Sequence, residues 1–131
     1  MQVTSQTPST KQPIFIIGAG GIVNTAHLPA YKIAGYEVHG IYDINNDKAA
    51  VTAKKFGVPG VYKSLQEMID KAPKNAIFDV AVPGSEMLSV LQKLPTGAAV
   101  LLQKPMGENL AVATKIIDLT RSKKMIALRV Q

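Results

Sequence analysis

Short apolar runs alternate with amphipathic stretches along almost the whole 131-residue chain. The first run, "IFII" at 14–17, lies between Pro13 and Gly18 and is wholly apolar, which is typical of a strand buried on both faces of a parallel sheet. Five further strands are predicted within segments 36–43, 60–72, 76–83, 98–103 and 125–130. Strands and helical segments therefore alternate along the chain.

Segment 20–27, "GGIVNTAH", opens the first helix directly after the first strand. Pro29 lacks a backbone N–H and clashes with the preceding turn, so we expect it to interrupt this helix. A second helical piece is then predicted from Pro29 to Ala34, with the proline at its first position. The next helix is predicted at 47–56.

Start and stop signals mark the later helices. Asn45 or Asn46 caps the helix at 47–56, and Gly57 follows its last turn. Ser64 and Glu67 form a capping box ahead of a short helix. Two more helices are predicted, one at 86–94 capped by Ser85, and one at 109–124 with Leu110, Ala113, Thr114 and Ile117 on one face.

Strands alternating with helices predict right-handed parallel crossovers, and so an α/β fold with a doubly wound parallel sheet of the Rossmann type. The strand order expected for such a sheet is 3-2-1-4-5-6, with ligand at the carboxyl ends of the strands. The length allows one domain, at 13–131, after a disordered polar tail at 1–12. That tail lacks the apolar core of a signal peptide, and we expect a cytoplasmic protein without membrane spans.

Composition excludes several kinds of chemistry. The chain has no cysteine, so disulfides, thiolate metal sites and cysteine nucleophiles are absent, and its two histidines disfavour a zinc site. The net charge of +6 comes from scattered side chains, apart from Lys54–Lys55 and the 121–124 segment "RSKK". Both clusters lie near predicted helix ends, where cations complement the helix dipole, and we expect neither a nucleic-acid partner nor a metal.

A glycine-rich turn lies between the first strand and the first helix, where backbone amides and the helix dipole favour an anion. Gly18 allows the tight turn and Gly20 allows a diphosphate to approach the backbone, while Val23 occupies the third place of a G-x-G-x-x-G pattern. Asp43 ends the second strand, where a dinucleotide fold places a carboxylate against the adenosine ribose. Because a carboxylate repels a 2′-phosphate, NAD(H) is favoured over NADP(H); the alternative makes Asp43 a cap or turn residue.

Several segments together resemble the N-terminal domain of the Gfo/Idh/MocA family, the glucose-fructose oxidoreductase and inositol dehydrogenase group. They are "GAGGIVNTAHLPAY", "GIYDIN", "VYKSLQEMI", "FDVAVPGSEM" and "LLQKPMGENLAVA". The most specific is "QKP" at 103–105, which is similar to the family's Glu-Lys-Pro motif. Family members continue into a second α/β domain that forms the substrate pocket, so the resemblance implies a C-terminal substrate domain missing from this chain.

The resemblance assigns roles to individual residues. Lys104 inherits a catalytic or substrate-orienting role beside the nicotinamide; the alternative is a solvated lysine before a turn. Gln103 replaces the family's glutamate, and Met87 stands where a histidine often follows the Thr-Pro turn, here Val82–Pro83. The implied cofactor-binding residues are Gly18, Gly20, Gly21, Ile22, Val23, Asp43, Ile44, Val82, Pro83, Met87, Gln103 and Lys104.

Three other ionisable residues receive no firm role. His27 could face a substrate, but a histidine near a helix end more often caps or packs. His39 lies within a predicted strand and is expected to pack or to be half exposed. Asp79 lies in the fourth predicted strand, and the sequence shows no partner for it.

The expected function is the NAD(H)-binding domain of an oxidoreductase that transfers hydride between nicotinamide and a sugar or polyol hydroxyl. The isolated domain is expected to be inactive, with a small-molecule substrate and a possible homo-oligomer as partners. A non-catalytic NAD(H)-binding sensor on the same scaffold is an alternative, favoured by Gln103. A second alternative is an S-adenosylmethionine-dependent methyltransferase, which also uses a glycine turn and an acidic second-strand end.

Overall fold

A computed structural model describes residues 12–102 and 110–128. The element order is β1 (Ile14–Ile17), the π-helix η1 (Val23–His27), α1 (Leu28–Ala34), β2 (Val38–Tyr42), α2 (Asn46–Phe56), β3 (Gly60–Tyr62), α3 (Leu65–Lys71), β4 (Ile77–Val80), α4 (Gly84–Lys93), β5 (Ala99–Leu102), α5 (Leu110–Ser122) and β6 (Ile126–Leu128). Positions 1–11 of the expected tail, and the "QKP" segment, lie outside the described residues.

All six strands form one sheet of order β3-β2-β1-β4-β5-β6, and every neighbouring pair is parallel. This confirms the predicted fold class and strand order. The order reverses between β1 and β4, which are paired with Ile17 opposite Val80. In open α/β sheets a ligand binds at such a reversal, outside the carboxyl ends of the strands.

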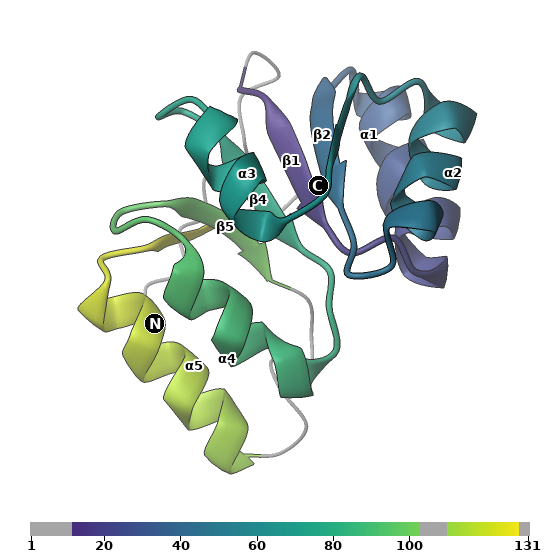
Figure 1. Cartoon of the computed structure of the whole chain (residues 1–131). Coiled ribbons are helices and arrows are strands. Elements are labelled where there is room, and N and C mark those ends of the chain that lie inside the picture. The colour runs from purple at the N-terminus through teal and green to yellow at the C-terminus, as the bar shows by residue number, and fades with distance from the viewer. Residues whose placement is uncertain (1–11, 103–109, 129–131) are drawn as a thin grey trace.

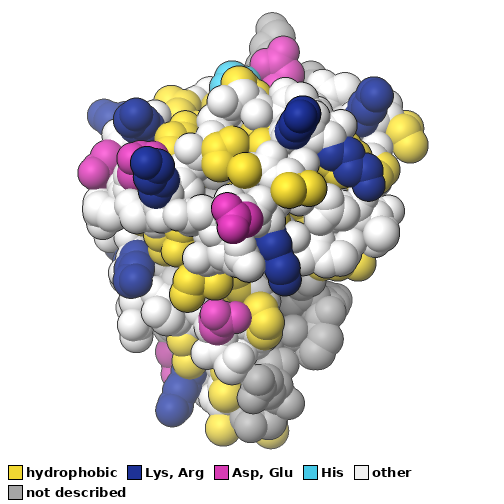
Figure 2. Space-filling model, turned by 45° about the vertical axis from the view of Figure 1, so that its right-hand side comes forward, with side chains coloured by type: hydrophobic (Ala, Val, Ile, Leu, Met, Phe, Trp, Pro, Cys, Tyr) yellow, Lys and Arg dark blue, Asp and Glu magenta, His cyan; other side chains and the backbone are white. Residues whose placement is uncertain are grey.

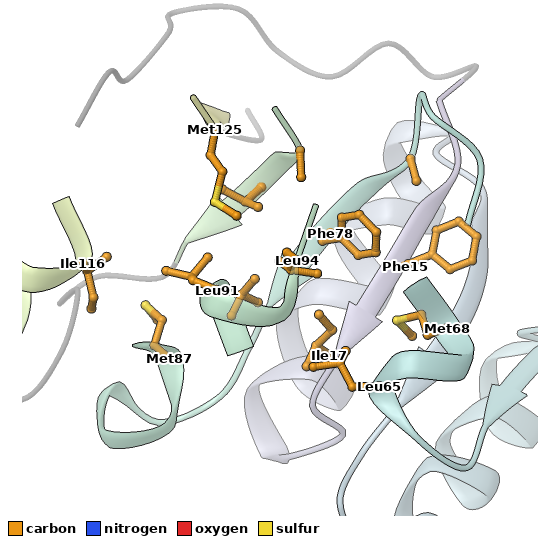
Figure 3. Packing of buried hydrophobic residues seen from close by; sticks show 14 residues of the cluster. Phe15, Ile17, Leu65, Met68, Phe78, Met87, Leu91, Leu94, Ile116 and Met125 are labelled. Carbon is orange, nitrogen blue, oxygen red and sulfur yellow. The ribbon is translucent and has the colours of Figure 1, made fainter. Parts of the chain in front are cut away.

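Helices cover both faces of the sheet (Figure 1). Successive side chains of a strand point to opposite faces, so each central strand contributes apolar residues to both. Phe15 and Ile17 of β1 face α3, α4 and α5, whereas Ile14 and Ile16 face α1 and α2. Figure 3 shows the first of these cores, in which side chains from α3, α4 and the sheet point into the same layer. Its largest fully buried members are Ile17, Met68, Met87, Leu91, Leu94, Ile116 and Val80.

The first helix differs from the prediction, because Pro29 does not interrupt it. Helical structure runs from Gly21 to Ala34, with the five-residue π-helix η1 directly before α1. Leu28 N–H donates to the Val23 carbonyl, five residues back, and this wider turn lets the helix pass the missing N–H of Pro29. A π segment inside an α-helix is frequently found at functional sites.

Helix caps confirm two predictions and correct a third. Asn45 caps α2, its side chain accepting from the amides of Asp47 and Lys48, and Ser64 caps α3. Ser85 does not cap α4, because that helix begins at Gly84 directly after Pro83, so Ser85 already lies in the first turn.

Helix α5 packs through Ile116 and Thr120, which are buried, whereas Leu110 is 83% exposed. Ile116 belongs to the same core as Met87 and Leu91 of α4.

On the face shown in Figure 2, Lys and Arg side chains are separated by hydrophobic, acidic and other side chains. Within 12–102 and 110–128, no helix is both long and apolar enough to cross a membrane.

Candidate functional site

The loop after β1 approaches β4 most closely at Gly18. Its φ is +115°, and a Cβ at this position would lie 2.4 Å from the Ala81 carbonyl oxygen. Gly18 N–H also donates to the Tyr42 carbonyl at 2.7 Å, which ties the loop to the end of β2. The fold itself therefore requires glycine here, since any side chain would clash with backbone.

Gly20 and Gly21 differ from Gly18 in this respect. A Cβ at either position would meet nothing within 4 Å apart from the chain neighbours and the nearby helix backbone, and neither residue has a positive φ. Packing and backbone conformation do not require glycine at these two positions. The open space lies at the carboxyl end of β1, where the missing side chains allow a ligand to approach the backbone amides. The site therefore fits the diphosphate of a dinucleotide.

Asp43 lies beside this loop at the end of β2. Its Oδ2 accepts a hydrogen bond from Ala19 N–H at 2.7 Å, and its Oδ1 accepts from Asn45 N–H at 2.8 Å. The carboxylate thus acts as a turn residue and also borders the glycine loop. Each oxygen retains a further lone pair, so these bonds are compatible with acceptance from ribose hydroxyls.

A groove of about 260 Å³ opens between the ends of β1, β2 and β4. It is lined by Ile17, Gly18, Gly20, Tyr42, Asp43, Ile44, Leu65, Ala81, Val82, Pro83, Glu86, Ser89, Val90 and Lys93. Six of the expected cofactor-binding residues are thereby brought together from three separate loops. Apolar walls with a few polar groups at the rim suit a nucleobase.

Other expected binding residues lie elsewhere. The side chains of Val23 and Met87 are 0% and 1% exposed; they belong to the two cores and line no part of the groove. Gly21 borders a neighbouring hollow of about 450 Å³ on the other side of the loop. Ile22 is 49% exposed and lines neither.

The catalytic candidate Lys104, together with Gln103, lies outside the described residues.

Sequence analysis missed the contribution of α4 to the groove. Glu86, Ser89, Val90 and Lys93 line it from one side of this helix. Their spacing of three, one and three residues places them on one helical face, and this spacing is visible in the sequence. From this helix only Met87 was expected to bind the cofactor, by the resemblance, and its side chain lies in the core.

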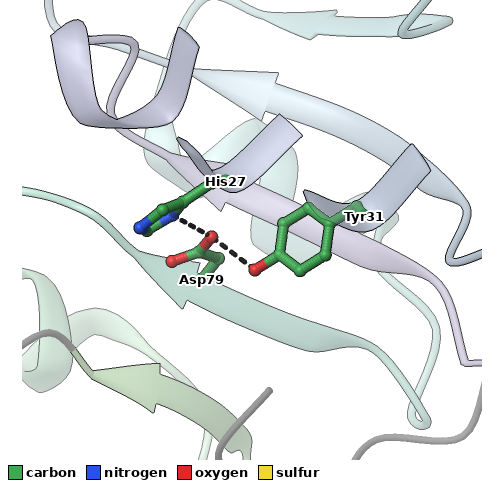
Figure 4. Close-up of polar contacts among 3 residues, drawn as sticks. All are labelled: His27, Tyr31 and Asp79. Carbon is green, nitrogen blue, oxygen red and sulfur yellow. Dashed lines mark hydrogen bonds and ion pairs between the residues drawn. The ribbon is translucent and has the colours of Figure 1, made fainter. Parts of the chain in front are cut away.

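A buried carboxylate, Asp79, forms the second polar cluster of the molecule, which we call the Asp79 cluster (Asp79, His27 and Tyr31; Figure 4). Asp79 is 1% exposed, in the middle of β4, and points toward the helix formed by η1 and α1. His27 Nδ1 lies 2.7 Å from its Oδ2, and the Tyr31 hydroxyl donates to the same oxygen at 2.6 Å.

Asp79 shifts the pKa values of both of its partners. The hydrogen bond to Asp79 raises the pKa of His27, against the opposing effect of burial. Burial and the Asp79 charge raise the pKa of Tyr31, which keeps its hydroxyl protonated as a donor. An acid inside an otherwise apolar strand was a sign that such partners exist.

His39 makes an exposed contact with Glu37, at 3.0 Å between Nε2 and Oε2. In the described part of the chain, no three His, Asp or Glu side chains gather as a metal ion would require.

Comparison with known proteins places this geometry in a family. Residues 13–131 match the GFO_IDH_MocA family, described as an oxidoreductase family with an NAD-binding Rossmann fold. The Salmonella typhimurium protein YceM, named as an oxidoreductase, is 31% identical over 113 residues, which are 86% of this chain and 36% of that protein. An inositol 2-dehydrogenase/D-chiro-inositol 3-dehydrogenase of Lacticaseibacillus casei is 29% identical over 85% of this chain and 33% of its own length.

Solved structures show the same fold. An oxidoreductase of Thermotoga maritima superposes with a TM-score of 0.77 at 23% identity, over 89% of this chain and 37% of that one. The WlbA dehydrogenase of Chromobacterium violaceum, solved with NADH and UDP-GlcNAcA, gives a TM-score of 0.75 at 19% identity, over 98% of this chain and 38% of that one. The chain thus spans about a third of the length of the relatives that it matches. With its glycine loop, its acidic second-strand end and this match over 13–131, the chain belongs to the Gfo/Idh/MocA oxidoreductase family and is an NAD-binding domain of that family.

Proposed function

We propose that this chain holds NAD(H) for hydride transfer to and from a hydroxyl-bearing carbon of a sugar or polyol. The observation that supports this most strongly is the pair Gly20 and Gly21, whose missing side chains serve neither packing nor backbone conformation. They lie beside Asp43 and the groove, so loop, acid and apolar walls have the arrangement that a dinucleotide needs.

In this proposal each part of the site binds one part of the cofactor. The amides of Gly20 and Gly21 would hold the diphosphate, and Asp43 would accept from the hydroxyls of the adenosine ribose. Ile44 and the Val82–Pro83 turn would form the apolar walls for the adenine. When bound, the nicotinamide accepts or donates the hydride at its own ring carbon.

Lys104 is proposed to orient the substrate hydroxyl and to stabilise charge that develops on its oxygen. This role rests on the match of "QKP" to the family's motif. In a longer form of the protein that contains a substrate domain, Lys104→Met should lower hydride transfer about a hundredfold and leave cofactor affinity nearly unchanged.

A sugar or polyol substrate is proposed because one relative is named as an inositol dehydrogenase and one structural neighbour was solved with a nucleotide sugar. The 131-residue chain alone is proposed to bind cofactor without turnover, because one domain leaves the substrate side of the nicotinamide open to water. A non-catalytic NAD(H) sensor is the second candidate, favoured by Gln103 in place of the family's glutamate. Family membership disfavours the methyltransferase.

A binding titration tests the proposal. The chain should bind NADH with an affinity well above that for NADPH and should not bind S-adenosylmethionine. Binding of S-adenosylmethionine without binding of NADH would refute it.

A further inference from the structure

Two polar side chains, Asn24 and Thr52, lie beside the glycine loop, and we call them the Asn24 cluster. The Asn24 side-chain amide donates to the carbonyls of Gly20 at 2.9 Å and Ala19 at 3.3 Å. The Thr52 hydroxyl of α2 donates to Asn24 Oδ1 at 3.0 Å. Thr52 is 3% exposed, so this contact is shielded from water.

The Thr52 hydroxyl determines which end of the Asn24 amide faces the loop. A hydroxyl that donates to Oδ1 fixes the oxygen toward α2, and the NH₂ group is then directed at the two loop carbonyls. Thr52 therefore acts on the loop through Asn24, without contacting the loop itself through this hydrogen bond.

Fixing a carbonyl also fixes the amide on the other side of the same peptide bond. Because a trans peptide is planar, its C=O and N–H point in opposite directions. With the carbonyls of Ala19 and Gly20 held toward Asn24, the N–H groups of Gly20 and Gly21 are directed away from it. Asp43 holds the preceding N–H, that of Ala19, so the loop is fixed on both sides.

We propose that Asn24 is a positioning residue for the cofactor diphosphate, aiming the N–H groups of Gly20 and Gly21, and that Thr52 sets the orientation of its amide. This rests on the proposed binding of NAD(H) at the glycine loop. A purely structural role, satisfying carbonyls at the start of the helix, would change stability instead of affinity.

The test compares Thr52→Val with Thr52→Ser, because valine removes the hydroxyl at nearly constant shape and serine keeps it. Neither substitution changes the charge near an anionic ligand. Dissociation constants for NADH and ADP-ribose, melting temperatures, and the NMR shifts of the Gly20 and Gly21 amides are measured for each variant. Thr114→Val is the matched control, since Thr114 makes a hydroxyl-to-carbonyl bond to Leu110 on the exposed side of α5.

We expect Thr52→Val to weaken both ligands about fivefold, which is the scale of one lost hydrogen bond between neutral groups. The two glycine amide shifts should move, while Thr52→Ser and Thr114→Val keep the parent affinity. Asn24→Ala, at a half-buried position, is the second variant should Thr52→Val not fold, with an expected loss of about tenfold.

Parent affinity in a folded Thr52→Val or Asn24→Ala protein would overturn the inference and leave the proposed cofactor site intact. A loss of affinity that follows the melting temperature alone, and that serine does not restore, would overturn it as well. A parent chain that binds neither NADH nor ADP-ribose would refute the proposed function, and this inference with it.

Discussion

The Asp79 cluster and the Asn24 cluster are attached to the same helix but differ in burial and charge. The first joins a buried carboxylate to an imidazole and fixes the helix to the centre of the sheet. The second joins two uncharged side chains, the half-buried Asn24 and the buried Thr52, and it contacts the loop where a ligand would lie. We infer that the first cluster sets stability and the second sets cofactor affinity, because a buried charge without its partner is costly even in the absence of ligand.

The largest expected effect comes from Asp79→Ala. Removing the carboxylate takes away the acceptor of the buried Tyr31 hydroxyl and of the half-buried His27 imidazole, and should lower the free energy of unfolding by roughly 3 kcal/mol. Urea unfolding measures this, with Asp118→Ala on the exposed side of α5 as the matched control. A loss no greater than that of the control would contradict the division between the clusters.

The next effect concerns Asp43, which contacts the same glycine loop as the Asn24 cluster. Asp43→Ala should weaken NADH about tenfold and NADPH much less, because the change removes both an acceptor for ribose and the charge that repels a 2′-phosphate. Titration of NADH and NADPH into the variant gives the ratio of their dissociation constants. Asp47→Ala, which removes a neighbouring exposed carboxylate, should keep the parent ratio. An equal loss for both cofactors in Asp43→Ala would leave Asp43 as a turn residue only.

A smaller effect is expected from pH, which changes the contribution of the Asp79 cluster to stability. The folded-state pKa of His27 is raised, so its stabilising contribution is fully present below its unfolded value near 6.5 and is lost as pH rises through the folded pKa. Unfolding free energies from pH 6 to pH 9 should therefore show the difference between parent and His27→Gln shrinking as pH rises. A difference that stays constant or grows would contradict the ion pair.

The sequence was sufficient to predict the sheet, but it was insufficient to predict the course of the helix at 21–34. Wholly apolar runs such as 14–17 indicated strands buried on both faces, and their alternation with helices indicated the doubly wound class and thereby its strand order. The passage of the helix through Pro29 was not predicted, because the wider turn of the π segment directly before it has no signal in the apolar pattern.

The candidate site was predictable to a similar degree. Gly18, Gly20 and Asp43 were expected from spacing and the Val82–Pro83 turn from the resemblance, and the structure brings them together at one groove. Met87 lies in the core, whereas Glu86 and Val90 of the same helix line the groove, and sequence position alone does not distinguish the two faces. Asn24 and Thr52 were missed because their contact joins residues 28 positions apart.

Replacement of Gly20 by alanine tests the central claim most directly, namely that this loop exists for a cofactor. A Cβ at Gly20 meets nothing within 4 Å apart from its chain neighbours, whereas at Gly18 it would clash with the Ala81 carbonyl. Gly18→Ala should therefore destabilise the fold, and Gly20→Ala should melt close to the parent while its NADH affinity falls more than about tenfold. A stable Gly20→Ala protein that binds NADH as tightly as the parent would contradict the account.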